Sequence, residues 1–135
     1  MFRRLAYAII FLLANSFAPF VSLCHSVDWP QWRGPTRDGI LPDKGIVLNT
    51  LPEQPKVLWK IKSGEGLASP VVINGSVFLF ENRNKNETMV SISAVDGSEK
   101  WATELSPVFE DGQGPRGPRC TPVVIDKQVF AQCSR

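Results

Sequence analysis

The stretch PVVINGSVFLF at residues 70–80 places two runs of β-branched and aromatic residues on either side of Asn74-Gly75. Runs of this kind are typical of β-strands. The Asn-Gly pair accepts the positive φ angles of a type I′ turn, which joins two antiparallel strands directly. The stretch therefore predicts a β-hairpin.

The same pattern returns later in the chain. The segment SPVVINGSVF at residues 69–78 aligns with TPVVIDKQVF at residues 121–130, 52 positions further on, and Trp59 aligns with Trp101 at an offset of 42. The two offsets differ because the second connection, residues 106–119, is longer and rich in Gly and Pro. Repeats of roughly this length, with several short strands per unit, are typical of β-propeller blades.

No helical periodicity interrupts the strand pattern after the first 26 residues, so the predicted class is all-β. Strands are expected over Val57–Ile61, Val71–Ile73, Val77–Phe80, Met89–Val95, Lys100–Glu104, Val123–Ile125 and Val129–Gln132. Residues 70–104 would supply one four-stranded blade, with parts of two neighbouring blades on either side. Because a propeller needs several blades to close its sheet edges, we expect the chain to be a fragment, the first part of a longer protein.

The chain begins like an export signal. Arg3 and Arg4 precede the apolar run LAYAIIFLL at residues 5–13, which is shorter than a membrane-spanning helix requires. The organisation expected is a signal peptide over 1–26, cleaved near Ser26, an N-terminal arm over 27–55 and a repeat region over 56–135. A retained membrane anchor and a lipoprotein cut before Cys24 are the alternatives. The mature chain is expected to be periplasmic or secreted, without a membrane span.

Removal of the signal changes the charge of the protein. The full sequence has 15 Lys and Arg and 13 Asp and Glu, and the signal carries two of the arginines, so the mature part is balanced. Nucleic acid is therefore not an expected partner. The single histidine, His25, lies in the signal, which excludes imidazole chemistry from the mature chain.

The sequence AVDGSEKW at residues 94–101 resembles the blade motif of the PQQ-like (pyrroloquinoline quinone repeat) β-propellers, in which a Trp follows a turn glycine by four residues. Gly97 and Trp101 keep this spacing, although the Thr of the motif is absent and the loop is shorter. The stretches DWPQWRGP at 28–35 and GPRCTP at 117–122 are similar to exported bacterial members of the same family. The resemblance implies a propeller.

The tryptophans have a structural role under this resemblance. An indole on the outer strand of one blade can pack on the backbone of the next and fix the angle between them. Trp59, Gly97 and Trp101 are the residues expected to dock blades. The alternative is that each Trp is a core aromatic of a small β-sandwich. Trp29 and Trp32, in the arm, would cap the propeller or bind a partner.

The loop DGQGPRGPR at residues 111–119 carries two guanidinium groups, which suit a carboxylate or phosphate ligand. Because the quinone cofactor of related dehydrogenases carries carboxylates, Arg116 and Arg119 are the candidate cofactor contacts. The competing interpretation is that they pair with local acids or carbonyl groups. No catalytic residue and no metal ligand is identified, and Gly64-Glu65-Gly66 is rejected as a phosphate-binding turn because a strand follows it.

Two cysteines would face each other across the second hairpin. If Asp126-Lys127 forms a two-residue turn, Cys120 pairs with Cys133 in the register that also places Pro122 opposite Ala131. An oxidising compartment permits a disulfide between them. Two free thiols are the alternative.

The function expected from these features is that of an exported, non-catalytic PQQ-like β-propeller module, a binding or assembly scaffold with envelope proteins as partners and without a cofactor. One alternative is the N-terminal part of a PQQ-dependent quinoprotein dehydrogenase acting on an alcohol or polyvinyl alcohol, with PQQ and calcium as cofactors. The other is a truncated product without activity.

Overall fold

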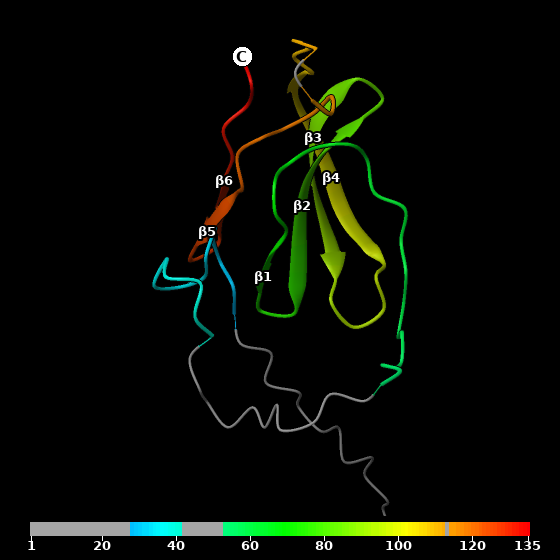
Figure 1. The fold of residues 1–135 in the computed structure, drawn as a ribbon, viewed down its shortest axis with the longest axis vertical. Coiled ribbons are helices and arrows are strands. Elements are labelled where there is room, and N and C mark those ends of the chain that lie inside the picture. The colour runs from blue at the N-terminus through cyan, green and yellow to red at the C-terminus, as the bar shows by residue number, and fades with distance from the viewer. Residues whose placement is uncertain (1–27, 42–52, 113) are drawn as a thin grey trace, which may run out of the picture.

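The computed structural model describes residues 28–41, 53–112 and 114–135. In these ranges the chain is all-β, as predicted. Strands β1 (Val71–Ile73), β2 (Ser76–Arg83), β3 (Asn86–Ser93) and β4 (Glu99–Pro107) form an antiparallel sheet in the order β1-β2-β3-β4. Strands β5 (Val123–Ile125) and β6 (Gln128–Phe130) form a separate hairpin, which lies on the β1 side of the sheet (Figure 1).

Both predicted hairpins form with the expected registers. Asn74 and Gly75 have φ angles of 49° and 66°, and β1 pairs with β2 from Ile73 opposite Ser76 onwards. In the second hairpin Ile125 lies opposite Gln128, so Asp126-Lys127 is the two-residue turn. A third tight turn joins β2 to β3, where Asn84 and Lys85 have φ angles of 54° and 66°.

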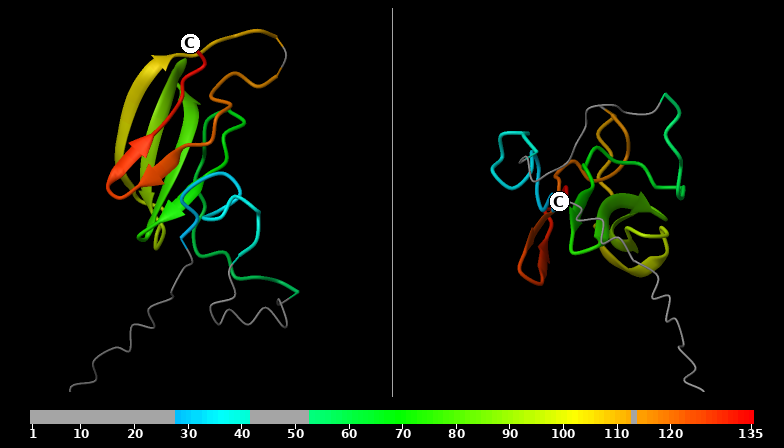
Figure 2. Two further views of the ribbon diagram at one scale, coloured as in Figure 1. Left: turned by 90° about the vertical axis from the view of Figure 1, so that its left-hand side faces the viewer. Right: turned by 90° about the horizontal axis from the view of Figure 1, so that it is seen from below.

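The core lies between the sheet and the β5–β6 hairpin (Figure 2). Val71, Phe78, Phe80 and Met89 are buried on one face of the sheet, and Val124 of β5 packs against them. Side chains alternate along a strand, so Phe78 and Phe80 of β2 point to the same face of the sheet. Met89 of β3 lies opposite Phe80 and therefore points to that face too. Burial of these apolar side chains holds the two sheets together.

The predicted strand over Val57–Ile61 is wrong. This segment is extended but forms no strand within the described residues, and Val57 and Leu58 are exposed. Its contact with the sheet runs through a side chain, since the Trp59 indole Nε1–H donates to the Ala94 carbonyl at 3.0 Å. In Figure 1 the segment before β1 passes over the sheet from the β4 side to the β1 side.

The same segment then makes a close backbone contact that we call the glycine seam, where residues 64–66 approach Asn82 of β2 and residues 117–118. Asn82 N–H donates to the Glu65 carbonyl at 2.7 Å, and the amides of Leu67 and Ala68 donate to the Pro118 carbonyl at 2.8 and 3.2 Å. A Cβ on Gly64 would lie 2.0 Å from the Asn82 carbonyl oxygen. Residues 64–66 therefore occupy the edge of β2 beyond the short strand β1, and residue 64 has to be glycine there.

The N-terminal arm also joins the sheet. Trp29 exchanges two backbone hydrogen bonds with Val72 of β1, at 2.6 and 2.9 Å, and the Pro30 carbonyl accepts from Val124 N–H of β5 at 2.9 Å. The Trp29 indole packs on Gly34, at a distance that leaves no room for a Cβ there. Trp32 is exposed, with the Arg33 guanidinium over its ring. Trp29 thus links the two sheets, and Trp32 faces outward.

The predicted signal peptide, with Cys24, and residues 27 and 42–52 of the predicted arm lie outside the described residues. Among the residues that are described, no helix is long and apolar enough to cross a membrane.

Replacement of Gly64 by Ala is expected to destabilise the fold, because the new Cβ would collide with the Asn82 carbonyl oxygen. We expect a loss of about 2 kcal/mol or more in the free energy of unfolding, measured by urea denaturation of the full chain. Gly114→Ala is the matched control, since no described atom other than those of its chain neighbours lies within 4 Å of a Cβ at that position. Equal stability of Gly64→Ala and Gly114→Ala would contradict the close approach.

Candidate functional site

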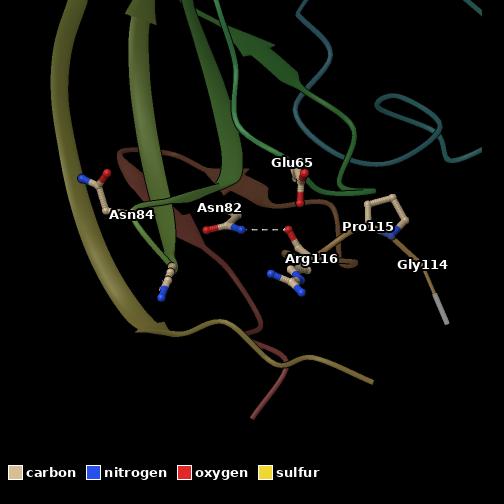
Figure 3. A pocket seen from close by; sticks show the side chains of 7 residues that line it. Glu65, Asn82, Asn84, Gly114, Pro115 and Arg116 are labelled. Carbon is tan, nitrogen blue, oxygen red and sulfur yellow. Dashed lines mark hydrogen bonds between the residues drawn. The ribbon is translucent and has the colours of Figure 1, made fainter. Parts of the chain in front are cut away.

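A polar pocket of about 550 Å³ lies where the β2–β3 turn meets the loop that follows β4 (Figure 3). It is lined by Glu65, Asn82, Asn84, Lys85, Gly114, Pro115 and Arg116. Its volume falls within the range of small-molecule sites, and its lining is mainly polar. The pocket brings together one of the two predicted arginines and four polar side chains that were not predicted.

The β2–β3 turn holds one side of the pocket. Arg83 pairs with Asn86, which leaves Asn84 and Lys85 as the two turn residues, both in the left-handed region. Asn tolerates this conformation well, whereas Lys adopts it less readily. The Lys85 carbonyl also accepts from Val108 N–H at 3.0 Å, which ties the turn to the end of β4. The Lys85 backbone is therefore held at a fixed position beside the pocket.

The glycine seam holds the other side. The Asn82 side-chain Nδ2–H donates to the Arg116 carbonyl at 3.1 Å, the contact drawn as a dashed line in Figure 3. A Cβ on Gly117 would lie 2.4 Å from the Glu65 carbonyl oxygen, so residue 117 also has to be glycine. Glu65, Asn82 and Arg116 come from three separate segments and meet because those segments touch at the seam.

The positive side chains of the pocket have little local neutralisation. Arg116 Nε lies 3.5 Å from a Glu110 carboxylate oxygen, and both side chains are more than half exposed. An exposed pair of this kind contributes little to stability. Within the described residues no carboxylate forms an ion pair with Lys85. Arg116 and Lys85 therefore give the pocket a positive side, and Glu65 adds one carboxylate.

Arg119, the second predicted cofactor contact, does not line this pocket. Its Nη2 donates to Asp111 Oδ1 at 2.7 Å, and the two side chains keep 40% and 19% of their surface exposed. This is the local acid pairing that was the competing interpretation for both arginines. The structure thus separates Arg116, which lines the pocket, from Arg119, which pairs with its own loop.

Trp59 and Gly97 contact each other. The indole lies on the turn between β3 and β4, and a Cβ on Gly97 would be 2.9 Å from the ring. Gly97 has a φ of 73°, and Asp96 Oδ1 closes the turn by accepting from Ser98 N–H and Oγ–H at 3.1 and 2.7 Å. These hydrogen bonds also lower the pKa of Asp96, the Ser98 hydroxyl contributing most.

Trp101 is placed differently. It lies on β4, keeps 40% of its surface exposed, and contacts Phe78 with the ring centroids 5.9 Å apart. Strand β4 is exposed along almost its whole length and pairs only with β3 among the described strands. Trp101 therefore covers the edge of the core and leaves an apolar surface open to solvent.

Cys120 and Cys133 are free thiols. The β5–β6 ladder ends at Val123 opposite Phe130 and does not reach them. After the ladder the chain is hydrogen-bonded to β3. The carboxylate of the fully buried Glu87 accepts from Ser134 N–H at 2.9 Å and from the Ser134 hydroxyl group. Both cysteines still line one cavity of about 270 Å³, together with Phe109, Arg119, Gln132 and Ser134.

Comparison with known proteins finds no matching family model, no similar curated protein and no similar solved structure. Among the described residues, no group of three or more His, Cys, Asp or Glu side chains is placed to hold a metal ion.

The two thiols are expected to differ in reactivity. Cys120 is exposed, whereas burial raises the pKa of Cys133, and the nearby Glu87 carboxylate raises it further. A raised pKa lowers the thiolate fraction at neutral pH, so iodoacetamide should alkylate Cys120 first and Cys133 only as the pH increases. Peptide mapping of the alkylated full chain follows each cysteine separately.

Glu87→Gln is the matched variant, because it removes the negative charge and keeps an acceptor for Ser134. It should speed the alkylation of Cys133 and leave Cys120 unchanged. A disulfide-linked peptide containing Cys120 and Cys133 in a non-reduced digest would contradict the free-thiol arrangement.

Proposed function

We propose that this chain is an exported, non-catalytic β-sheet module of the PQQ-like propeller type that serves as a binding or assembly scaffold at the cell envelope. The observation that carries the proposal is the contact of Trp59 with the Gly97 turn and the Ala94 carbonyl. In this contact a tryptophan from outside the sheet fastens a separate segment to the β3–β4 turn, which is how a blade-docking tryptophan would act.

The arrangement of the sheet supports the proposal. Four consecutive strands pair in chain order, from the buried β1 to the exposed β4, as the strands of a blade do. Trp101 occupies the sequence position that corresponds to Trp59, but within the described residues it has no glycine turn to pack on. Its exposed ring would receive such a turn from a neighbouring sheet or a partner protein.

The alternative of a quinoprotein dehydrogenase stays a prediction. Arg116 lines a pocket, which is the observation in its favour, whereas Arg119 is engaged with Asp111. Calcium-dependent dye reduction after addition of PQQ, measured on the exported chain, would favour this alternative over a scaffold.

The Trp59 contact is tested by Trp59→Phe. The variant keeps an aromatic ring and loses the N–H that donates to Ala94, so we expect the free energy of unfolding to fall by about 1 kcal/mol. Trp32→Phe is the control, since Trp32 is exposed and contacts Arg33 through its ring face. Equal stabilities of the two variants would remove the main support for the docking role.

The scaffold role is tested by tagging the chain, fractionating cells and cross-linking. We expect the tagged protein in the envelope or secreted fraction, in a cross-linked complex that Trp101→Ser abolishes and Trp32→Ser retains. Retention of the chain in the cytosol, or a complex that survives Trp101→Ser, would contradict the proposal.

A further inference from the structure

Two positively charged residues from different elements line the polar pocket at the β2–β3 turn. Lys85 belongs to the turn itself, and Arg116 follows Pro115 in the loop after β4. Neither is strongly neutralised, because Arg116 has one exposed pair with Glu110 and Lys85 has none among the described residues. We propose that this pocket binds a small hydroxylated carboxylate of the uronic acid class.

The charge of the lining supports a single carboxylate as the anionic group. A guanidinium and an ammonium together form charge-assisted hydrogen bonds to a carboxylate. The carboxylates of Glu65, in the pocket, and Glu110, beside Arg116, would repel a doubly charged group such as a phosphate monoester more strongly than a carboxylate. The pocket therefore favours an anionic group with one negative charge, on a free sugar acid or on one unit of a uronate polymer.

The remaining polar groups suit hydroxyls. The Asn82 amide uses one N–H on the Arg116 carbonyl, which leaves its Oδ1 as an acceptor. Asn84 offers both a donor and acceptors, and the Glu65 carboxylate accepts hydroxyl hydrogens. Figure 3 shows Glu65, Asn82 and Arg116 gathered together, with Asn84 set apart from them. A sugar acid presents hydroxyls on the same small ring as its carboxylate.

The backbone positions from which these side chains extend are set before any ligand arrives. The left-handed turn fixes the Lys85 backbone, and the glycine seam fixes the backbones of Glu65 and Arg116 and the Asn82 side-chain amide. Preorganisation of this kind lowers the entropy cost of binding. The pocket is open and lacks an aromatic side chain in its lining, so for a ligand of this size we expect a dissociation constant on the order of 1 mM.

The inference stands apart from the scaffold proposal, because the pocket and the Trp59 contact share no residue. Its test uses the full chain and sodium D-glucuronate, followed by ¹H–¹⁵N chemical-shift titration. Lys85→Asn removes the ammonium and keeps a residue that favours the left-handed conformation, and Arg116→Gln removes the guanidinium. Lys127→Asn makes the same charge change in the turn between β5 and β6, away from the pocket.

We expect glucuronate to shift the amides of residues 82–86, 114, 116 and 117, with affinity reduced about tenfold by Lys85→Asn and by Arg116→Gln and unchanged by Lys127→Asn. D-Glucose, which lacks the carboxylate, and acetate, which lacks the hydroxyls, should each bind much more weakly. Trigalacturonate distinguishes the source: tighter binding than the monosaccharide indicates a polymer-borne uronate, and weaker binding indicates a free sugar acid.

The proposal is overturned if glucuronate causes no saturable shift, if glucose or acetate binds as well as glucuronate, or if Lys85→Asn and Lys127→Asn behave alike. Circular dichroism of each variant shows whether it is folded. If Arg116→Gln does not fold, the affinity of Lys85→Asn for glucuronate alone tests the proposal.

Discussion

The close approach of three backbone segments at the glycine seam is the constraint on which the rest of the described structure depends. Residues 64–66, Asn82 of β2 and residues 117–118 come so near that a Cβ on Gly64 or Gly117 would overlap a carbonyl oxygen, at 2.0 and 2.4 Å. The seam supplies hydrogen-bond partners to the edge of β2 where β1 has already ended. Without it, that edge would expose unpaired backbone groups over the core.

The seam also creates the pocket. Glu65 and Asn82 belong to the seam, and Arg116 directly precedes Gly117, so the same contacts that complete the sheet set the positions of the three side chains. On the opposite face of β2, Glu81 is buried and accepts from Gly64 N–H at 2.8 Å and from the Arg83 guanidinium. Arg83 pairs with Glu81 and Glu99, and its positive charge neutralises the buried Glu81 carboxylate.

The sequence was informative where structure is local. The Asn74-Gly75 and Asp126-Lys127 turns fixed both hairpin registers, because a two-residue turn determines which residues oppose each other. The strand expected over Val57–Ile61 did not form: Val57 and Leu58 are exposed, and the segment contacts the sheet through the Trp59 side chain and not through a ladder. A pattern of apolar residues alone does not distinguish a strand in a ladder from an extended segment that is held by one side chain.

The site was less predictable because it depends on contacts between distant segments. Arg116 was recognised from its loop, whereas Lys85 was missed although Asn84-Lys85 lies between two strand-forming runs and could have been read as a turn. Glu65 and Asn82 had no sequence signal, since 17 positions separate them and only the folded seam joins them. The hairpin register predicted that Cys120 and Cys133 face each other, but the β5–β6 ladder ends before it reaches them. The hydrogen bond of Ser134 to Glu87 of β3, which holds the chain after β6, had no sequence signal.

The most direct test of this account is amide hydrogen exchange at the glycine seam, measured by NMR on the full chain. The amides of Asn82 and Leu67, which donate to the carbonyls of Glu65 and Pro118, should be protected to the same degree as the ladder amides between β2 and β3. Exchange of Asn82 and Leu67 at unprotected rates, while the β2–β3 amides remain protected, would contradict the seam and the pocket built on it.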